Sequence, residues 1–106
     1  MLIRTFIKAG TRKEAEDCLK NLLSLAETLN LKFTVINFEP YWKFDDSFQI
    51  EISGTEPTDE QLRKFLEGTA SKWDRFPNSF LATRTLEGCT IFFDNIEFIQ
   101  IFDKDF

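Results

Sequence analysis

Apolar and polar residues alternate with a period of two most clearly in residues 47–53. The apolar positions of this stretch are Phe48, Ile50 and Ile52. The polar positions are Ser47, Gln49, Glu51 and Ser53. This pattern predicts a strand with one buried face and one face in water. Residues 2–7 and 31–38 are rich in β-branched and aromatic side chains, so we predict that they are strands as well.

Two other stretches show the spacing of three and four residues that is typical of a helix. Thr11 is followed by Glu14, which is a capping-box pattern, and an apolar stripe then runs to Asn30. Its members are Ala15, Cys18, Leu19, Leu22, Ala26 and Leu29. We expect the helix to end at Asn30, because Asn tolerates a left-handed backbone. Thr58 and Gln61 repeat the capping pattern before a second stripe, which consists of Leu62, Phe65, Leu66 and Ala70.

The pattern becomes irregular in residues 73–78. Trp73 continues the second apolar stripe, so we expect it to pack on the core, and Pro77 prevents the helix from continuing. Three short strands are predicted after it, at residues 79–84, 89–93 and 96–102. The pairs Glu87-Gly88 and Asp94-Asn95 can supply the positive φ that tight hairpins between these strands need.

The predicted elements follow one another in the order β-α-β-β-α-β-β-β. A chain of 106 residues is long enough to bury one core, so residues 1–106 are expected to form a single domain. We predict an α+β fold that is ferredoxin-like in its first part, with two helices on one face of an antiparallel sheet. The other face of the sheet would then be open, with the polar positions of residues 47–53 on it.

Composition and length place the protein among small globular domains. Hydrophobic residues make up 42% of the chain and charged residues 29%, and Phe is unusually frequent, with 13 residues. Strand residues alternate between faces, so neighbours such as Phe92 and Phe93 cannot both point into one core, and some Phe side chains should be exposed. No apolar run is long enough for a membrane span and residues 1–10 do not resemble a signal peptide, so a cytoplasmic location is expected.

Charge is distributed unevenly along the chain. The net charge of −5 argues against direct binding of nucleic acid, which depends on Lys and Arg side chains that replace counterions. Residues 37–62 contain seven acidic side chains and a single basic one, Lys43, whereas residues 1–36 have a net charge of +2. The acidic block contains the predicted strand at residues 47–53 and the connection that precedes it.

The residue types that support catalysis are scarce. The sequence has no His, no Gly-rich phosphate loop and no CxxC pair, and Cys18 and Cys89 are predicted to be reduced core thiols. Glu39, Asp45 and Asp46 could offer oxygen ligands to Mg²⁺ or Ca²⁺, but adjacent strand residues point to opposite faces and seldom converge on one ion. We therefore expect no catalytic residues, no metal site and no cofactor, with a carboxylate-and-metal enzyme as the remaining catalytic alternative.

The stretch FEPYWKFDDSF, residues 38–48, holds the only Tyr and one of the two Trp of the chain beside two aspartates. One interpretation is that Tyr41 and Trp42 cap the end of the core, with Asp45 and Asp46 as solvated turn residues. The other is a docking surface, because Tyr and Trp are the usual anchors of protein interfaces. Acidic side chains beside such anchors would steer a basic partner, such as the cleft of a nuclease, toward them.

In its size, acidity, use of Phe and Trp, and element order, the chain resembles the immunity proteins of bacterial contact-dependent growth inhibition and related polymorphic toxin systems. The stretches EPYWKFDDSFQIEI and SKWDRFPNSF contribute to this resemblance. It implies a one-to-one complex with a cognate toxin C-terminal domain, often a tRNase or DNase, whose active site or an adjacent surface is blocked. The expected contacts are Glu39, Tyr41, Trp42, Asp45, Asp46, Glu51 and Asp74.

Two other functions remain open at this point. One is a small ferredoxin-like regulatory domain that dimerises and binds a metabolite at the seam. The other is a phage-type inhibitor of a host nuclease. The sequence leaves open the oligomeric state, the toxin and the sheet face that a partner would use.

Overall fold

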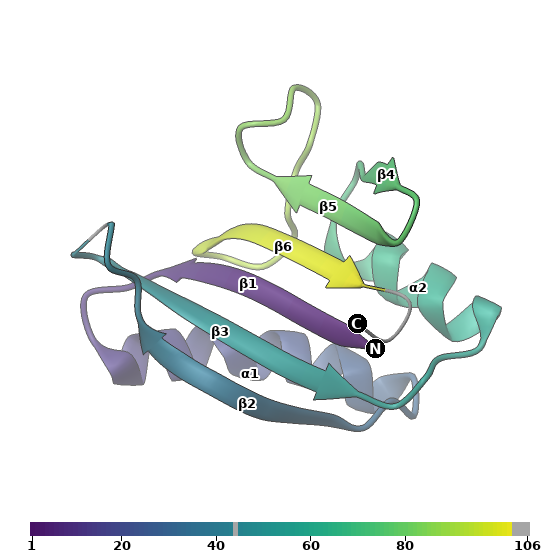
Figure 1. The fold of residues 1–106 in the computed structure, drawn as a ribbon, viewed down its shortest axis with the longest axis horizontal. Helices are drawn as coiled ribbons and strands as arrows, with labels where there is room; N and C mark the ends of the chain where they lie inside the picture. The colour runs from purple at the N-terminus through teal and green to yellow at the C-terminus, as the bar shows by residue number, and fades with distance from the viewer. Residues whose placement is uncertain (44, 103–106) are drawn as a thin grey trace.

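A computed structural model describes residues 1–43 and 45–102 of the chain. Its elements are β1 (Leu2–Lys8), α1 (Arg12–Thr28), β2 (Phe33–Pro40), β3 (Ser47–Gly54), α2 (Asp59–Thr69), β4 (Asp74–Phe76), β5 (Ser79–Thr83) and β6 (Ile96–Phe102). The six strands form one antiparallel sheet in the order β2-β3-β1-β6-β5-β4 (Figure 1). The predicted fold class is thus confirmed.

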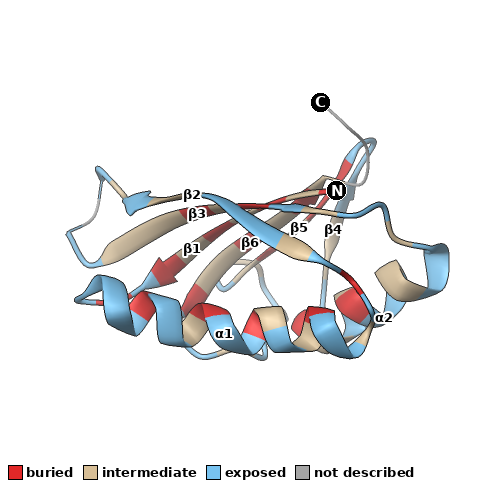
Figure 2. Ribbon diagram, turned by 90° about the horizontal axis from the view of Figure 1, so that it is seen from below, coloured by how far each residue is buried: buried red, intermediate tan, exposed pale blue. Residues whose placement is uncertain are grey.

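The sheet combines a ferredoxin-like half with an added hairpin. The order β2-β3-β1-β6 is that of a ferredoxin-like sheet in which β6 takes the place of the fourth strand. The hairpin of β4 and β5 extends the sheet beyond β6. Both helices lie against the same face of the sheet, and neither helix covers the opposite face (Figure 2).

Both helices begin, and α1 ends, as the sequence predicts. The Thr11 hydroxyl accepts a hydrogen bond from the backbone N–H of Glu14 at 3.2 Å, and Thr58 and Gln61 form a complete capping box. Asn30 has φ 60°, and the hydrogen bonds after α1 are those of a Schellman motif, with the Leu31 N–H donating to the Ala26 carbonyl at 2.9 Å. Local hydrogen bonding therefore sets these boundaries.

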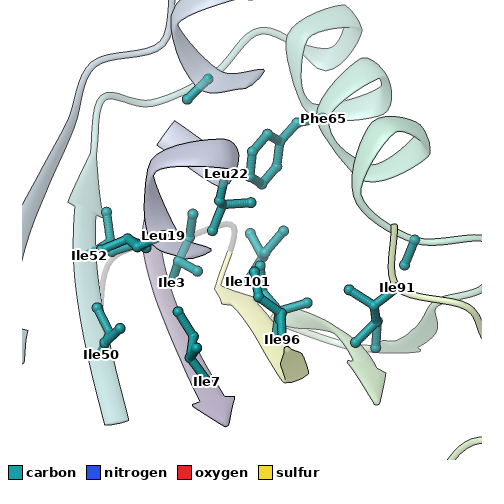
Figure 3. Close-up of a cluster of buried hydrophobic side chains, with 14 of the residues drawn as sticks. Ile3, Ile7, Leu19, Leu22, Ile50, Ile52, Phe65, Ile91, Ile96 and Ile101 are labelled. Atoms are coloured by element: carbon teal, nitrogen blue, oxygen red, sulfur yellow. The ribbon is translucent and has the colours of Figure 1, made fainter. Parts of the chain in front are cut away.

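The core fills the space between the sheet and the two helices (Figure 3). Its fully buried large side chains are Ile3, Ile7, Leu22, Ile50, Ile52, Phe65, Ile96, Ile99 and Ile101. Thr5 is buried among them, and its hydroxyl donates to the Phe98 carbonyl at 2.8 Å, so the polar group is satisfied. Trp73 packs against this cluster as expected, and its indole N–H donates to the Leu66 carbonyl at 2.9 Å.

Between α2 and β6 the strand predicted at residues 79–84 is confirmed as β5, but the predictions on either side of it are wrong. Residues 89–93 are not a strand, since only Ile91 forms an isolated bridge, to Ala70, whereas the segment predicted to be irregular contains β4. The carbonyls of the loop are used by a side chain instead: the Arg84 guanidinium donates to the carbonyls of Ile91, Phe93 and Ile96. Residues 89–93 therefore form a loop that hydrogen bonds from Arg84 hold in place, and they do not pair as a strand.

Both thiols are reduced and half-buried, and both pack against the core cluster. Cys89 does so from a loop and not from the strand that was predicted for it. None of the helices described is long and apolar enough to span a membrane.

Candidate functional site

The open face of the sheet is the face that neither helix covers (Figure 2). In β1 the residues Ile3, Thr5 and Ile7 are buried toward the helices, so their neighbours point to the open face. The strand register extends this face across the sheet. Its side chains include Arg4, Phe6 and Lys8 of β1, Gln49 and Glu51 of β3, Phe98 and Gln100 of β6, Leu81 of β5 and Asp74 of β4.

Four aromatic rings follow one another on this face, and we call Phe98, Phe6, Tyr41 and Trp42 the aromatic row. Phe6 and Phe98 are cross-strand partners, with ring centroids 4.8 Å apart. Tyr41 follows β2 directly and folds back over Phe6, with centroids 4.7 Å apart and planes at 27°. Trp42 lies 6.1 Å from Tyr41 and is 81% exposed. An exposed Trp at the end of a row of rings in contact is the arrangement expected of an interface anchor.

The position of these rings tests the first interpretation of residues 38–48, in which Tyr41 and Trp42 cap the core. Trp42 caps no core, because most of its surface is in solvent. Tyr41 is half-buried, but it covers Phe6 on the open face and lies outside the core between sheet and helices. The interpretation that these two residues cap the core is therefore wrong for Trp42. Tyr41 does cover an apolar group, but that group is the Phe6 ring on the open face.

The connection between β2 and β3 is closed at its base by one backbone hydrogen bond and held to the body of the domain by another. The Tyr41 N–H donates to the Ser47 carbonyl at 2.8 Å, and the Ala9 N–H donates to the Asp46 carbonyl at 2.8 Å. Lys43 adds a cation–π contact, with its ammonium 5.1 Å from the Trp42 ring centroid. The aromatic row is thus presented by an anchored hairpin.

Two of the predicted contact carboxylates are neutralised by β1. Arg4 lies 3.6 Å from Glu51, which also accepts a hydrogen bond from the Asn37 amide at 3.2 Å. Lys8 lies 3.8 Å from Asp46. The acidic block of the sequence is therefore less negative in space than along the chain, because the antiparallel register places these cations of β1 beside it.

Other predicted carboxylates lack such partners. Glu39 and Asp45 are both exposed close to Trp42 in the chain, and neither has an ion pair among the residues described. Asp74 lies on the open face too, but its strand is four places from that of Glu51 in the sheet. At a strand spacing of about 4.8 Å this separates them by about 19 Å. The predicted set therefore divides into a cluster at the hairpin and a remote Asp74.

The sequence did not predict several residues of the open face. Phe6 and Phe98 support the aromatic row, and Phe76 of β4 is exposed on the same face. The alternation of residues in β1 and β6 could have identified Phe6 and Phe98. In both strands mainly Ile residues occupy the buried face, and the other face combines Phe with polar residues. Phe92 is exposed as well, in agreement with the expectation that some Phe side chains cannot reach the core.

The helix side of the molecule has shallow grooves. Two lie between α1 and β2, with volumes of about 330 Å³ and 240 Å³, and Leu23 lines both. A third, of about 360 Å³, lies beside α2 and is lined by Leu62, Leu66, Arg75 and Phe80, among others. Within the described part of the chain, no group of three or more His, Cys, Asp or Glu side chains could hold a metal ion.

Comparisons of this chain with protein-family models, curated proteins and solved structures found no match.

Proposed function

We propose that this protein binds another protein through the aromatic row and the β2–β3 hairpin, and that it serves as an immunity protein against a cognate toxin domain, most simply a nuclease. The observation that supports this best is Trp42, which is 81% exposed at the end of the aromatic row. A rigid aromatic side chain that is solvated in the free protein has much apolar surface to bury in a complex and little conformational entropy to lose.

The charges around Trp42 support a basic partner. Glu39 and Asp45 have no ion pair within the described residues, so their charge is available to a cation on the partner. Nuclease clefts are basic because they hold phosphates, and carboxylates that approach such a cleft speed association by long-range attraction. Arg4 pairs with Glu51 of β3 and Lys8 pairs with Asp46 of the hairpin, so the attraction is assigned to Glu39 and Asp45, on either side of Trp42 in the chain.

The proposal expects a secreted toxin to be encoded next to the gene for this protein, and the C-terminal domain of that toxin is the binding partner used in the test. Binding is measured by calorimetry and by the salt dependence of the association rate. Asp45→Lys/Asp46→Lys should lower affinity and remove most of the salt dependence, and Trp42→Ala should lower affinity by about 30-fold or more. The matched control is Asp59→Lys/Glu60→Lys, another adjacent acidic pair, which lies in the first turn of α2 on the helix side.

Two results would count against the proposal. Equal losses in the hairpin and control variants would mean that only net charge matters, and unchanged affinity in both hairpin variants would remove the hairpin from the interface. Inhibition of toxin activity, measured on the same variants, should follow affinity.

A further inference from the structure

The edge strand β2 presents unpaired backbone next to an apolar groove. Within residues 1–43 and 45–102, β2 pairs with β3 alone and forms one edge of the sheet (Figure 1). The Lys32 carbonyl and the Tyr41 N–H point to β3, where they bond to Thr55 and Ser47. Alternation along the strand therefore turns the backbone groups of Phe33 and Val35 away from the sheet. Such an edge can add another strand.

Apolar side chains accompany this free edge. Ile36 is 57% exposed at the bulge of β2, and Val35 is 38% exposed. The two grooves between α1 and β2 meet at Leu23 and so run along most of the strand. An added strand would place alternate side chains in this groove while its backbone bonds to β2.

We propose that the added strand is β2 of a second copy of this protein, so that two domains join edge to edge around a two-fold axis. The register that pairs Phe33 with Phe38 of the second copy is self-complementary. In the same register Lys32 faces Glu39 of the second copy, and the symmetry makes this ion pair twice. The axis then passes between Val35 and Ile36 of each strand, where the exposed apolar side chains are buried.

The helices fit the same axis. Leu23 lines both grooves, one beside Phe33 and the other beside Phe38, so it lies at the level of the strand centre. Two antiparallel α1 helices that meet at Leu23 bring Lys20 of one copy toward Glu27 of the other. Both side chains line these grooves, one on each side of Leu23. Strand and helix thus show complementary charge about one axis, which identifies the occupant as a second copy.

One contact has to be replaced. The Arg12 guanidinium lies 4.2 Å from the Phe38 ring centroid and donates to the Phe38 carbonyl at 3.3 Å. In the dimer, the Phe33 N–H of the second copy replaces this donor. The guanidinium is exposed, so it is free to turn to Glu16, which it already contacts at 3.2 Å.

This inference goes beyond the proposed function and uses a different surface. The dimer occupies the β2 edge and the helix side, whereas the aromatic row lies on the open face. Only Glu39 belongs to both. A dimer would carry two aromatic rows and bind two partner molecules.

The test is sedimentation velocity on the full chain over a concentration series up to about 1 mM. Wild type should dimerise, and Lys32→Glu and Glu39→Lys should each weaken dimerisation by at least about tenfold, because each places two like-charged pairs at the interface. An equimolar mixture of the two variants should restore dimers as heterodimers, since a carboxylate then faces an ammonium in both symmetry-related pairs. Lys64→Glu and Asp59→Lys on α2 are the charge-matched controls, and circular dichroism verifies folding.

The mixture of Lys32→Glu and Glu39→Lys is the decisive measurement, because two misfolded variants could not restore dimerisation when combined. Lys32 and Glu39 lie seven residues apart on one strand, about 23 Å, so the rescue cannot arise within one chain. A wild-type protein that stays monomeric throughout the series overturns the proposal. So does a dimer that the single reversals leave intact, or a mixture that stays monomeric.

Discussion

The ring of Tyr41 stacks on the ring of Phe6, with centroids 4.7 Å apart and an angle of 27° between the planes. This contact joins the hairpin to the centre of the sheet, because Phe6 belongs to the central strand β1 and is flanked by Phe98. The contact holds Tyr41 on the sheet, while the adjacent Trp42 extends into solvent. We therefore expect Tyr41 to contribute to stability and Trp42 to contribute to binding.

Tyr41→Ala should lower the free energy of unfolding by about 1–2 kcal/mol, because the stacking on Phe6 and its apolar burial are lost. Trp42→Ala should change it by no more than about 0.5 kcal/mol, since the side chain is largely exposed. Urea denaturation of both variants measures the difference. Equal losses would mean that Trp42 is structural and would weaken its assignment as an anchor.

Gly54→Ala should destabilise the protein by about 1–3 kcal/mol through overpacking. A Cβ at this position would lie 2.7 Å and 2.8 Å from two carbons of the Phe33 ring, which packs edge-on against Phe65 at 5.4 Å. Gly10→Ala is the control, because the nearest atom to its Cβ is 3.8 Å away. Thermal unfolding should show a lower midpoint for Gly54→Ala only.

Asn30→Ala should cost about 1 kcal/mol, because residue 30 has φ 60° and a side chain with a plain Cβ disfavours this left-handed region. Asn30→Gly should keep or slightly raise stability at the same position. The comparison is made by denaturant titration. An Asn30→Ala variant as stable as Asn30→Gly would show that the Schellman turn relaxes without strain.

Arg84→Lys should lower the free energy of unfolding by about 1–3 kcal/mol although the charge is kept. The guanidinium donates to the Ile96 and Phe93 carbonyls at 2.9 Å and pairs with Glu97 at 3.1 Å, and a single ammonium cannot reach all of these groups. Arg63→Lys on the exposed face of α2 should have an effect within about 0.5 kcal/mol. Hydrogen exchange of residues 85–95 should accelerate in Arg84→Lys and stay unchanged in the control.

The elements that the sequence predicts well are those with local causes. Thr11, Thr58 and Asn30 mark helix ends through hydrogen bonds within a few residues, and the alternation of residues 47–53 reports directly which face is buried. Residues 89–93 misled because their apolar character resembles a strand. Their backbone carbonyls are engaged by Arg84, whose role depends on the folded loop and has no periodic signal.

The candidate site divides in the same way. The sequence identified Tyr41 and Trp42 as unusual, and an acidic block around them, because composition and order are enough for that. It could not show that Phe6 and Phe98 complete the row, or that Arg4 and Lys8 neutralise Glu51 and Asp46. Those facts depend on which strands become neighbours.

By itself, then, the amino-acid order determined where both helices begin and where α1 ends, which strand residues are apolar, and that aromatic and acidic residues gather between β2 and β3. Only the tertiary structure decided which rings stack, which carboxylates keep their charge unpaired, and which strand is left at the edge. The physical reason is the separation along the chain between the residues that interact. Caps and alternation act over a few residues, whereas ring stacking and ion pairing act across strands whose partners lie far apart in the chain.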